Sequence, residues 1–170
     1  MSRIAYVDGV YQPIDMPGIY VEDRGYQFAD GVYEVCAVHN ARPVDEEAHL
    51  DRLERSLAEL GIAAPMSRAA MKIVVRETLA RNRIRNGIVY MQVTRGVASR
   101  EHNYPAGLKP VLVVTARHTD PARRASVLRD GISVVTVPDQ RWARCDIKSI
   151  SLLPNVLARQ AAKDRGVHEA

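Results

Sequence analysis

The stretch RWARCDIKSISLLPNVLARQAAKDRG (Arg141–Gly166) decides the organisation of this chain, because it places Lys148 between two kinds of secondary structure. A β-rich segment, Gly131–Asp139, precedes the lysine. Apolar residues at helical spacing predict a helix over Ser151–Arg165 after it, with a serine cap at position 149 or 151. Pro154 is compatible with this helix because it falls in the first turn. The sequence thus predicts a lysine at a strand-to-helix junction.

Such a position can prepare a lysine for covalent chemistry. The positive end of the helix dipole, the neighbouring charges of Arg141 and Arg144, and partial burial beside Trp142 would all disfavour the ammonium form of Lys148. A neutral amine can attack a carbonyl carbon and form a Schiff base. The alternative from local context is a solvated lysine at the start of a helix.

Composition sets the class of protein. The 170 residues are 46% hydrophobic and 5% aromatic, which is enough for one domain with an aliphatic core and part of another. The net charge is +4, but the arginines are scattered, so no nucleic-acid partner is expected. No apolar run approaches the ~18 residues of a membrane span, and no signal peptide is visible. Cys36 and Cys145 are too few for a disulfide framework, so reduced thiols and a cytoplasmic location are expected.

The order of the predicted elements indicates an α+β fold with an N-terminal antiparallel sheet and two helices, followed by the start of a second α/β domain. The predicted elements are a hairpin of Arg3–Val7 and Val10–Ile14 around Asp8-Gly9, strands at Val32–His39, Gly87–Arg95, Val111–Arg117 and Ile132–Val137, and helices at Asp45–Leu60, capped by Asp45, and Ser67–Asn82. The polar stretch His118–Ser126 is interpreted as a linker. The predicted domains are therefore residues 1–120 and residues 121–170, with Lys148 in the second.

Two groups of polar residues have the spacing of a binding site. On the helix at residues 45–60, His49 and Arg52 lie at the border of the leucine stripe and could reach inward, whereas Arg55 is expected to be a surface charge. Arg100 and His102 are two apart in a loop, so in an extended segment both side chains could converge on one carboxylate. No spacing of histidines and cysteines predicts a metal site.

The stretch around Lys148 resembles the segment around the cofactor-binding lysine of D-amino-acid aminotransferases, the fold-type IV enzymes that depend on pyridoxal phosphate. The resemblance continues in VEDRGYQFADGVYEV (Val21–Val35), HLDRL (His49–Leu53) and YMQVTRG (Tyr90–Gly96), and so covers essentially the whole chain in the family's order.

This resemblance implies a role for each candidate residue. Lys148 would carry the cofactor as a Schiff base and later move a proton, and Arg52, supported by His49, would bind the cofactor's phosphate. Tyr33, Arg100 and His102 would bind the substrate α-carboxylate. The arginine and histidine would come from the neighbouring subunit, which implies a homodimer.

The implied activity is transamination of D-amino acids such as D-alanine with a 2-oxo acid acceptor. Same-fold aminodeoxychorismate lyase, branched-chain aminotransferase and amine transaminase activities remain alternatives, as does a non-catalytic fragment. The family continues well past the position of Ala170, with an acidic partner for the pyridine nitrogen and further phosphate ligands. The chain is therefore expected to be truncated and, alone, to transaminate poorly or not at all.

Overall fold

The computed structural model describes residues 3–16 and 18–170, which fall into two compact units. Unit 1 consists of the chain up to Thr119 together with Asp146–Ile150, and unit 2 consists of Asp120–Cys145 and Ser151–Ala170. The predicted domain division between residues 120 and 121 stays a prediction. The compact units differ from it because the five residues around Lys148 pack with unit 1.

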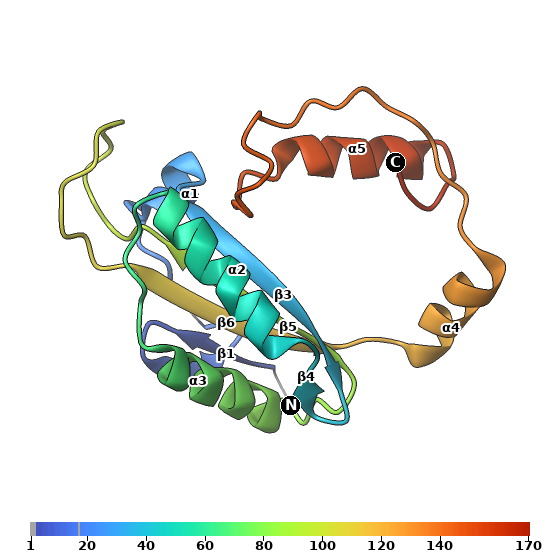
Figure 1. Cartoon of the computed structure of the whole chain (residues 1–170), viewed down its shortest axis with the longest axis horizontal. Helices are drawn as coiled ribbons and strands as arrows, with labels where there is room; N and C mark the ends of the chain where they lie inside the picture. Colours follow the sequence, from blue (N-terminus) through green and yellow to red (C-terminus); the bar gives the residue numbers. More distant parts are fainter. Residues whose placement is uncertain (1–2, 17) are drawn as a thin grey trace. The chain divides into compact units, whose positions relative to one another are not determined.

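Unit 1 contains one antiparallel six-stranded sheet with the strand order β2-β1-β6-β5-β3-β4 (Figure 1). The strands are β1 (Ile4–Val7), β2 (Val10–Pro13), β3 (Gly31–His39), β4 (Arg42–Pro43), β5 (Gly87–Thr94) and β6 (Val111–His118). The hairpin between β1 and β2 forms as predicted, because Asp8 and Gly9 both adopt the positive φ angles that a tight two-residue turn requires. The predicted antiparallel α+β architecture is confirmed.

Burial along the strands alternates, so the sheet has one covered face. In β3, Val32, Glu34, Cys36 and Val38 are buried, whereas the residues between them are half-buried. Because successive side chains of a strand point to opposite faces, Tyr33 and Glu34 lie on opposite sides of the sheet.

Two helices of unit 1, α2 (Glu46–Glu59) and α3 (Arg68–Arg81), cover that buried face (Figure 1). Leucines of α2 and valines of α3 join the strands in one hydrophobic core. The side chain of Ser67 caps α3 by accepting a hydrogen bond from the Ala70 amide. The predicted cap of α2 is wrong: Asp45 precedes the helix in a left-handed conformation, and its side chain makes no capping hydrogen bond.

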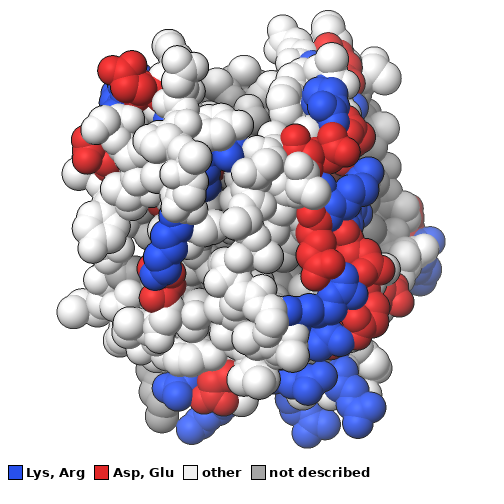
Figure 2. Space-filling model, turned by 60° about the vertical axis from the view of Figure 1, so that its left-hand side comes forward, with Lys and Arg blue, Asp and Glu red and all other residues white. Residues whose placement is uncertain are grey.

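Ion pairs join the solvent sides of these two helices. Arg68 contacts Asp51 and Glu54 at 2.6 Å, and Lys72 pairs with Glu47. Basic and acidic side chains alternate in a column along one side of the surface in Figure 2. Exposed pairs of this kind contribute little stability individually, so the buried core holds the unit together.

The segment Asp146–Ile150 adds a short extended stretch beside the first residues of β3. Ile147 is buried in the core, and Val32 forms an antiparallel bridge with Ser149. The intervening Lys148 is half-buried. A five-residue stretch is thus fixed by the sheet of unit 1 even though it lies far away in the sequence.

The short helix α1 (Arg24–Phe28) also belongs to unit 1, whereas α4 (Pro121–Asp130) and α5 (Leu153–Asp164) belong to unit 2. The predicted linker at His118–Ser126 is wrong, because most of it forms α4. Its polar composition supplies a helix start: the carboxylate of Asp120 accepts a hydrogen bond from the Ala122 amide.

Two further predictions for unit 2 are wrong. Within the described residues, Ile132–Val137 forms no strand and contributes only an isolated bridge between Val134 and Glu169. A β-branched segment becomes a strand only where a neighbouring strand supplies hydrogen bonds. Helix α5 begins after Leu152 with no side-chain cap, so the predicted serine cap is absent.

Candidate functional site

Three hydrogen bonds within unit 1 fix the backbone at Lys148 and at the nearby Asp146. Its carbonyl accepts a hydrogen bond from the Tyr33 amide (3.0 Å), and its amide donates to Ser56 Oγ (3.3 Å). Just before it, Arg55 Nη2 donates to the carbonyl of Asp146 (2.9 Å). Arg55 is exposed, as predicted for a surface charge, and its guanidinium also fastens the lysine segment to α2.

The side chain of Lys148 lies over an aromatic ring. Its Nζ is 4.2 Å from the centroid of Tyr33, and Tyr33 stacks on Tyr90 with centroids 5.7 Å apart. Burial, followed by the proximity of Tyr33, raises the pKa of Tyr90 to about 12, so Tyr90 is a neutral phenol at ordinary pH. Lys148 thus lies against Tyr33 of β3.

Two of the residues that were expected to influence Lys148, Arg141 and Trp142, belong to unit 2. Arg141 Nη2 pairs with Asp139 (2.7 Å), and Trp142 is 45% exposed. The carboxylate of Asp139 therefore neutralises the charge of Arg141 within this ion pair.

On the helix-covered face, Glu34 gathers both residues that were predicted to bind the cofactor's phosphate. Glu34 has no exposed side-chain surface, and it accepts hydrogen bonds from Arg52 Nε (2.5 Å), Arg52 Nη2 (2.8 Å) and His49 Nδ1 (2.8 Å). Burial would raise the pKa of Glu34, but these hydrogen bonds outweigh burial and lower it. Hydrogen bonding to Glu34 also raises the pKa of Arg52, to which Tyr33 makes a smaller contribution.

One nitrogen of the Arg52 guanidinium remains available to bind a ligand. Glu34 occupies Nε and Nη2 of Arg52, the side chain of Arg52 is 44% exposed, and no hydrogen bond to its Nη1 is found among the described residues. A fixed arginine with an outward donor can bind an oxyanion. Sequence reasoning missed Glu34, although its position directly after Tyr33 implied the opposite face of the same strand.

Arg100 and His102 lie in the loop between β5 and β6, and both are exposed. The guanidinium carbon of Arg100 is 5.3 Å from the centroid of the Phe28 ring, and the ring of His102 is 5.7 Å from the same centroid. Both side chains therefore contact one residue of α1.

The structure thus arranges the predicted site residues in three groups within unit 1. These are Lys148 with Tyr33, His49 with Arg52, and Arg100 with His102. The assignment of functions to these six residues stays a prediction. Among the residues that the structure describes, no group of histidine, cysteine or carboxylate side chains is arranged to hold a metal ion.

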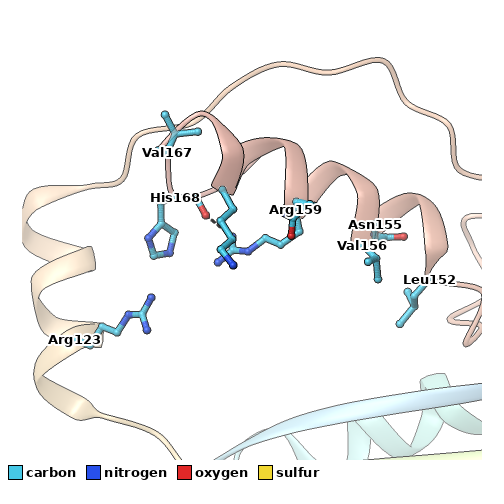
Figure 3. Close-up of a pocket in the computed structure, with 10 residues that line it drawn as sticks. Arg123, Leu152, Asn155, Val156, Arg159, Val167 and His168 are labelled. Atoms are coloured by element: carbon cyan, nitrogen blue, oxygen red, sulfur yellow. Dashed lines mark hydrogen bonds between the residues drawn. The ribbon is translucent and has the colours of Figure 1, made fainter.

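A separate open cavity of about 700 Å³ lies within unit 2 (Figure 3). Arg123, Arg159 and His168 line it, but Arg159 already binds the carboxylate of Glu169 and the carbonyl of His168. None of the six predicted residues contributes to this cavity, and Arg159 is already paired.

Comparison with known proteins defines the class. The profile of the family "Amino-transferase class IV" matches residues 31–170, and the chain belongs to this family. It is 45% identical over 151 residues to a D-alanine aminotransferase of Bacillus licheniformis, covering 88% of this chain and 52% of the relative. It is 39% identical over 171 residues to a D-alanine aminotransferase of Staphylococcus haemolyticus, covering all of this chain and 60% of the relative. The chain thus spans only 52–60% of the length of these curated relatives.

Solved structures agree on the fold. A branched-chain amino acid aminotransferase of Escherichia coli superposes with a TM-score of 0.85 at 18% identity, covering 99% of this chain and 58% of that one. A fold IV transaminase of Curtobacterium pusillum superposes with a TM-score of 0.72 at 26% identity, covering 93% of this chain and 56% of that one. The fold is that of the fold-type IV aminotransferases. None of the helices in the described part is long and apolar enough to cross a membrane.

Proposed function

We propose that this chain carries the lysine half of an enzyme that transaminates D-amino acids, such as D-alanine, with a 2-oxo acid acceptor and pyridoxal phosphate. The observation that supports this most directly is the placement of Lys148. Its backbone is fixed against β3 while its amine lies over the Tyr33 ring. The identity to D-alanine aminotransferases supports the choice of substrate class.

The residues present suit this cofactor. An aldehyde requires a primary amine, which Lys148 supplies, and a phosphate requires a cation with free donors, which Arg52 supplies with His49 beside it. Glu34 fixes the orientation of Arg52 while leaving an outward N–H group. When bound, pyridoxal phosphate supplies an electron sink for the negative charge that develops at the substrate α-carbon.

The chain's own groups would then perform binding and proton transfer. Nζ of Lys148, once released from carrying the cofactor, accepts the proton from the substrate α-carbon. Tyr33, together with Arg100 and His102, binds the α-carboxylate. In the proposed homodimer, the loop with Arg100 and His102 serves the site of the neighbouring subunit.

Covalent trapping tests the proposal. The chain is incubated with pyridoxal phosphate, reduced with borohydride and digested, and the modified peptide is located by mass spectrometry. We expect modification at Lys148 and its loss in Lys148→Ala. Lys109→Ala is the matched control, because a hydrogen bond from Lys109 to Asp8 raises the pKa of that lysine and keeps it as an ammonium ion. Absence of modification at Lys148 would support a non-catalytic fragment.

Turnover distinguishes the activities of the same fold. Turnover by this chain alone is expected to be slow, and whatever pyruvate it forms should come from D-alanine and 2-oxoglutarate, without comparable formation from L-alanine. Preference for a branched-chain L-amino acid, a simple amine or aminodeoxychorismate would contradict the proposed substrate class.

A further inference from the structure

Arg24 is a buried arginine that none of the proposed steps uses. It is only 3% exposed and lies on the short helix α1, within the motif VEDRGYQFADG. Its Nη1 donates to the carbonyl of Glu101 (2.7 Å), and its Nη2 donates to the carbonyl of His102 (3.2 Å). A buried guanidinium thus holds the backbone of the loop that presents Arg100 and His102.

Asp30 joins this arginine to a second one. Nε of Arg24 (2.8 Å) and Nε of Arg95 (2.7 Å) both donate to Oδ2 of Asp30. Burial would raise the pKa of Asp30, but the hydrogen bonds from Arg95 and Arg24 outweigh burial and lower it. A single carboxylate therefore remains ionised between two buried cations.

Arg95, at the start of the loop, connects it to the end of α2 and to Tyr104. Its Nη2 donates to the carbonyl of Leu60 (2.8 Å) at the end of α2, and its guanidinium carbon lies 3.7 Å from the centroid of the Tyr104 ring. The guanidinium of Arg24 also approaches Tyr104, at 5.6 Å. The loop leaves the sheet after β5 (Figure 1), yet Arg24 holds its backbone at two carbonyls and both arginines contact its Tyr104 ring.

The backbone beneath the loop is equally constrained. The amide of Arg24 donates to the carbonyl of Gly96 (2.9 Å), and a Cβ added to Gly25 would lie 2.2 Å from Cγ2 of Thr94. The same helix provides Phe28, against which the side chains of Arg100 and His102 rest. Helix α1 therefore supports the loop through both its backbone and its side chains.

We infer that Arg24, Asp30 and Arg95 are positioning residues that hold Arg100 and His102 ready for the substrate carboxylate. The sixteen residues between β5 and β6 would otherwise have to be ordered on binding, and prior ordering removes that entropy cost from substrate affinity. The effect on affinity rests on the proposed function, whereas the anchoring of the loop does not.

Hydrogen exchange tests the anchoring in the full chain without any cofactor. In Arg24→Lys, the lysine cannot reach two carbonyls and Asp30 at once, so the amides of residues 99–104 should exchange roughly tenfold faster than in the wild type. Tyr104→Leu, at a residue that is 51% exposed, should have the same local effect without endangering folding. Unchanged exchange of residues 99–104 in both variants would overturn the inference.

Arg81→Lys is the matched control, because Arg81 also lies over a tyrosine, with its guanidinium carbon 4.5 Å from the Tyr11 centroid, and also pairs with an acid, Glu77. It contacts α3 and β2 rather than the loop, so exchange at residues 99–104 should not change. Faster exchange of the loop in this control would mean that any loss of a guanidinium loosens it, and would overturn the specific role of Arg24.

Kinetics test the functional part. Arg24→Lys should raise the KM for D-alanine roughly tenfold with kcat within about twofold. The reason is that the α-carboxylate contact contributes equally to binding of the substrate and of the transition state. In an Arg100→Ala/His102→Ala background it should have no further effect, because the positioned groups are gone. Equal effects in both backgrounds would refute positioning. A wild-type chain that takes up no pyridoxal phosphate at Lys148 would refute the proposed function instead, and exchange alone would then decide the anchoring.

Discussion

Replacing Glu34 by glutamine should destabilise unit 1 and release Arg52. The carboxylate of Glu34 is fully buried, and it accepts two hydrogen bonds from Arg52 and one from His49. Glutamine keeps the shape of the side chain but replaces one acceptor oxygen by an NH₂ group. That group faces donors, so at least one N–H of the guanidinium loses its partner.

The size of the expected loss in stability depends on how exposed Arg52 and His49, the partners of Glu34, are. Removing one member of a buried ion pair costs about 3–5 kcal/mol. The side chain of Arg52 is 44% exposed and that of His49 is 22% exposed, so water partly replaces the lost contacts. This partial hydration places the cost at about 3 kcal/mol, the lower end of that range.

Urea unfolding of the two units can be followed separately. All seven tyrosines precede residue 105 and lie in unit 1, whereas Trp142 is the one tryptophan and lies in unit 2. The midpoint from near-ultraviolet circular dichroism of tyrosine should fall in Glu34→Gln. The midpoint from tryptophan fluorescence reports on unit 2 independently.

Glu47→Gln is the control for this experiment. Glu47 is 62% exposed and pairs with Lys72 and Arg68 on the same helix pair, so its loss should lower the urea midpoint much less than the loss of Glu34. A Glu34→Gln chain that unfolds at the same urea concentration as Glu47→Gln would refute the reasoning that the Glu34 cluster is a buried, charge-assisted network.

Two further predictions concern titration and thiol reactivity. Because Asp30 and Glu34 have folded pKa values below their ordinary 3.8 and 4.5, their contribution to stability is fully present above those ordinary values and is lost as pH falls through the lowered folded values. The tyrosine-detected urea midpoint should therefore decrease between about pH 5 and pH 3, and a constant midpoint would contradict this. Burial, with smaller contributions from nearby carboxylates, raises the pKa of Cys36 to about 12, whereas Cys145 is exposed. Iodoacetamide at about pH 8 should thus modify Cys145 alone in the native chain and both thiols in urea, as measured by mass spectrometry; native modification of Cys36 would contradict its burial.

Some elements are determined by local sequence. Asp8-Gly9 supplies the two positive φ angles of the first hairpin, and the leucine stripe of α2 has a single apolar face, so both elements could be predicted from neighbouring residues alone. The segment Ile132–Val137 could not, because a strand depends on a partner that lies elsewhere in the chain.

The candidate site shows the same division. Lys148, Arg52 and Arg100 could be predicted from the sequence by residue type and spacing. The proposed reaction requires an amine, a phosphate-binding cation and a carboxylate-binding cation. Glu34 and Arg24 were not singled out, because each acts through residues that are distant along the chain: Glu34 on α2, and Arg24 on a loop about 77 residues later.

The sequence by itself determined helices α2, α3 and α5, the first hairpin, the family and the chemistry available to Lys148, since each depends on residue types at fixed local spacing. Only the tertiary structure decided that Lys148 packs with the first unit. The contacts responsible, from Tyr33, Ser56 and Arg55, join segments about 90 or more residues apart, and local propensity carries no information about such pairings.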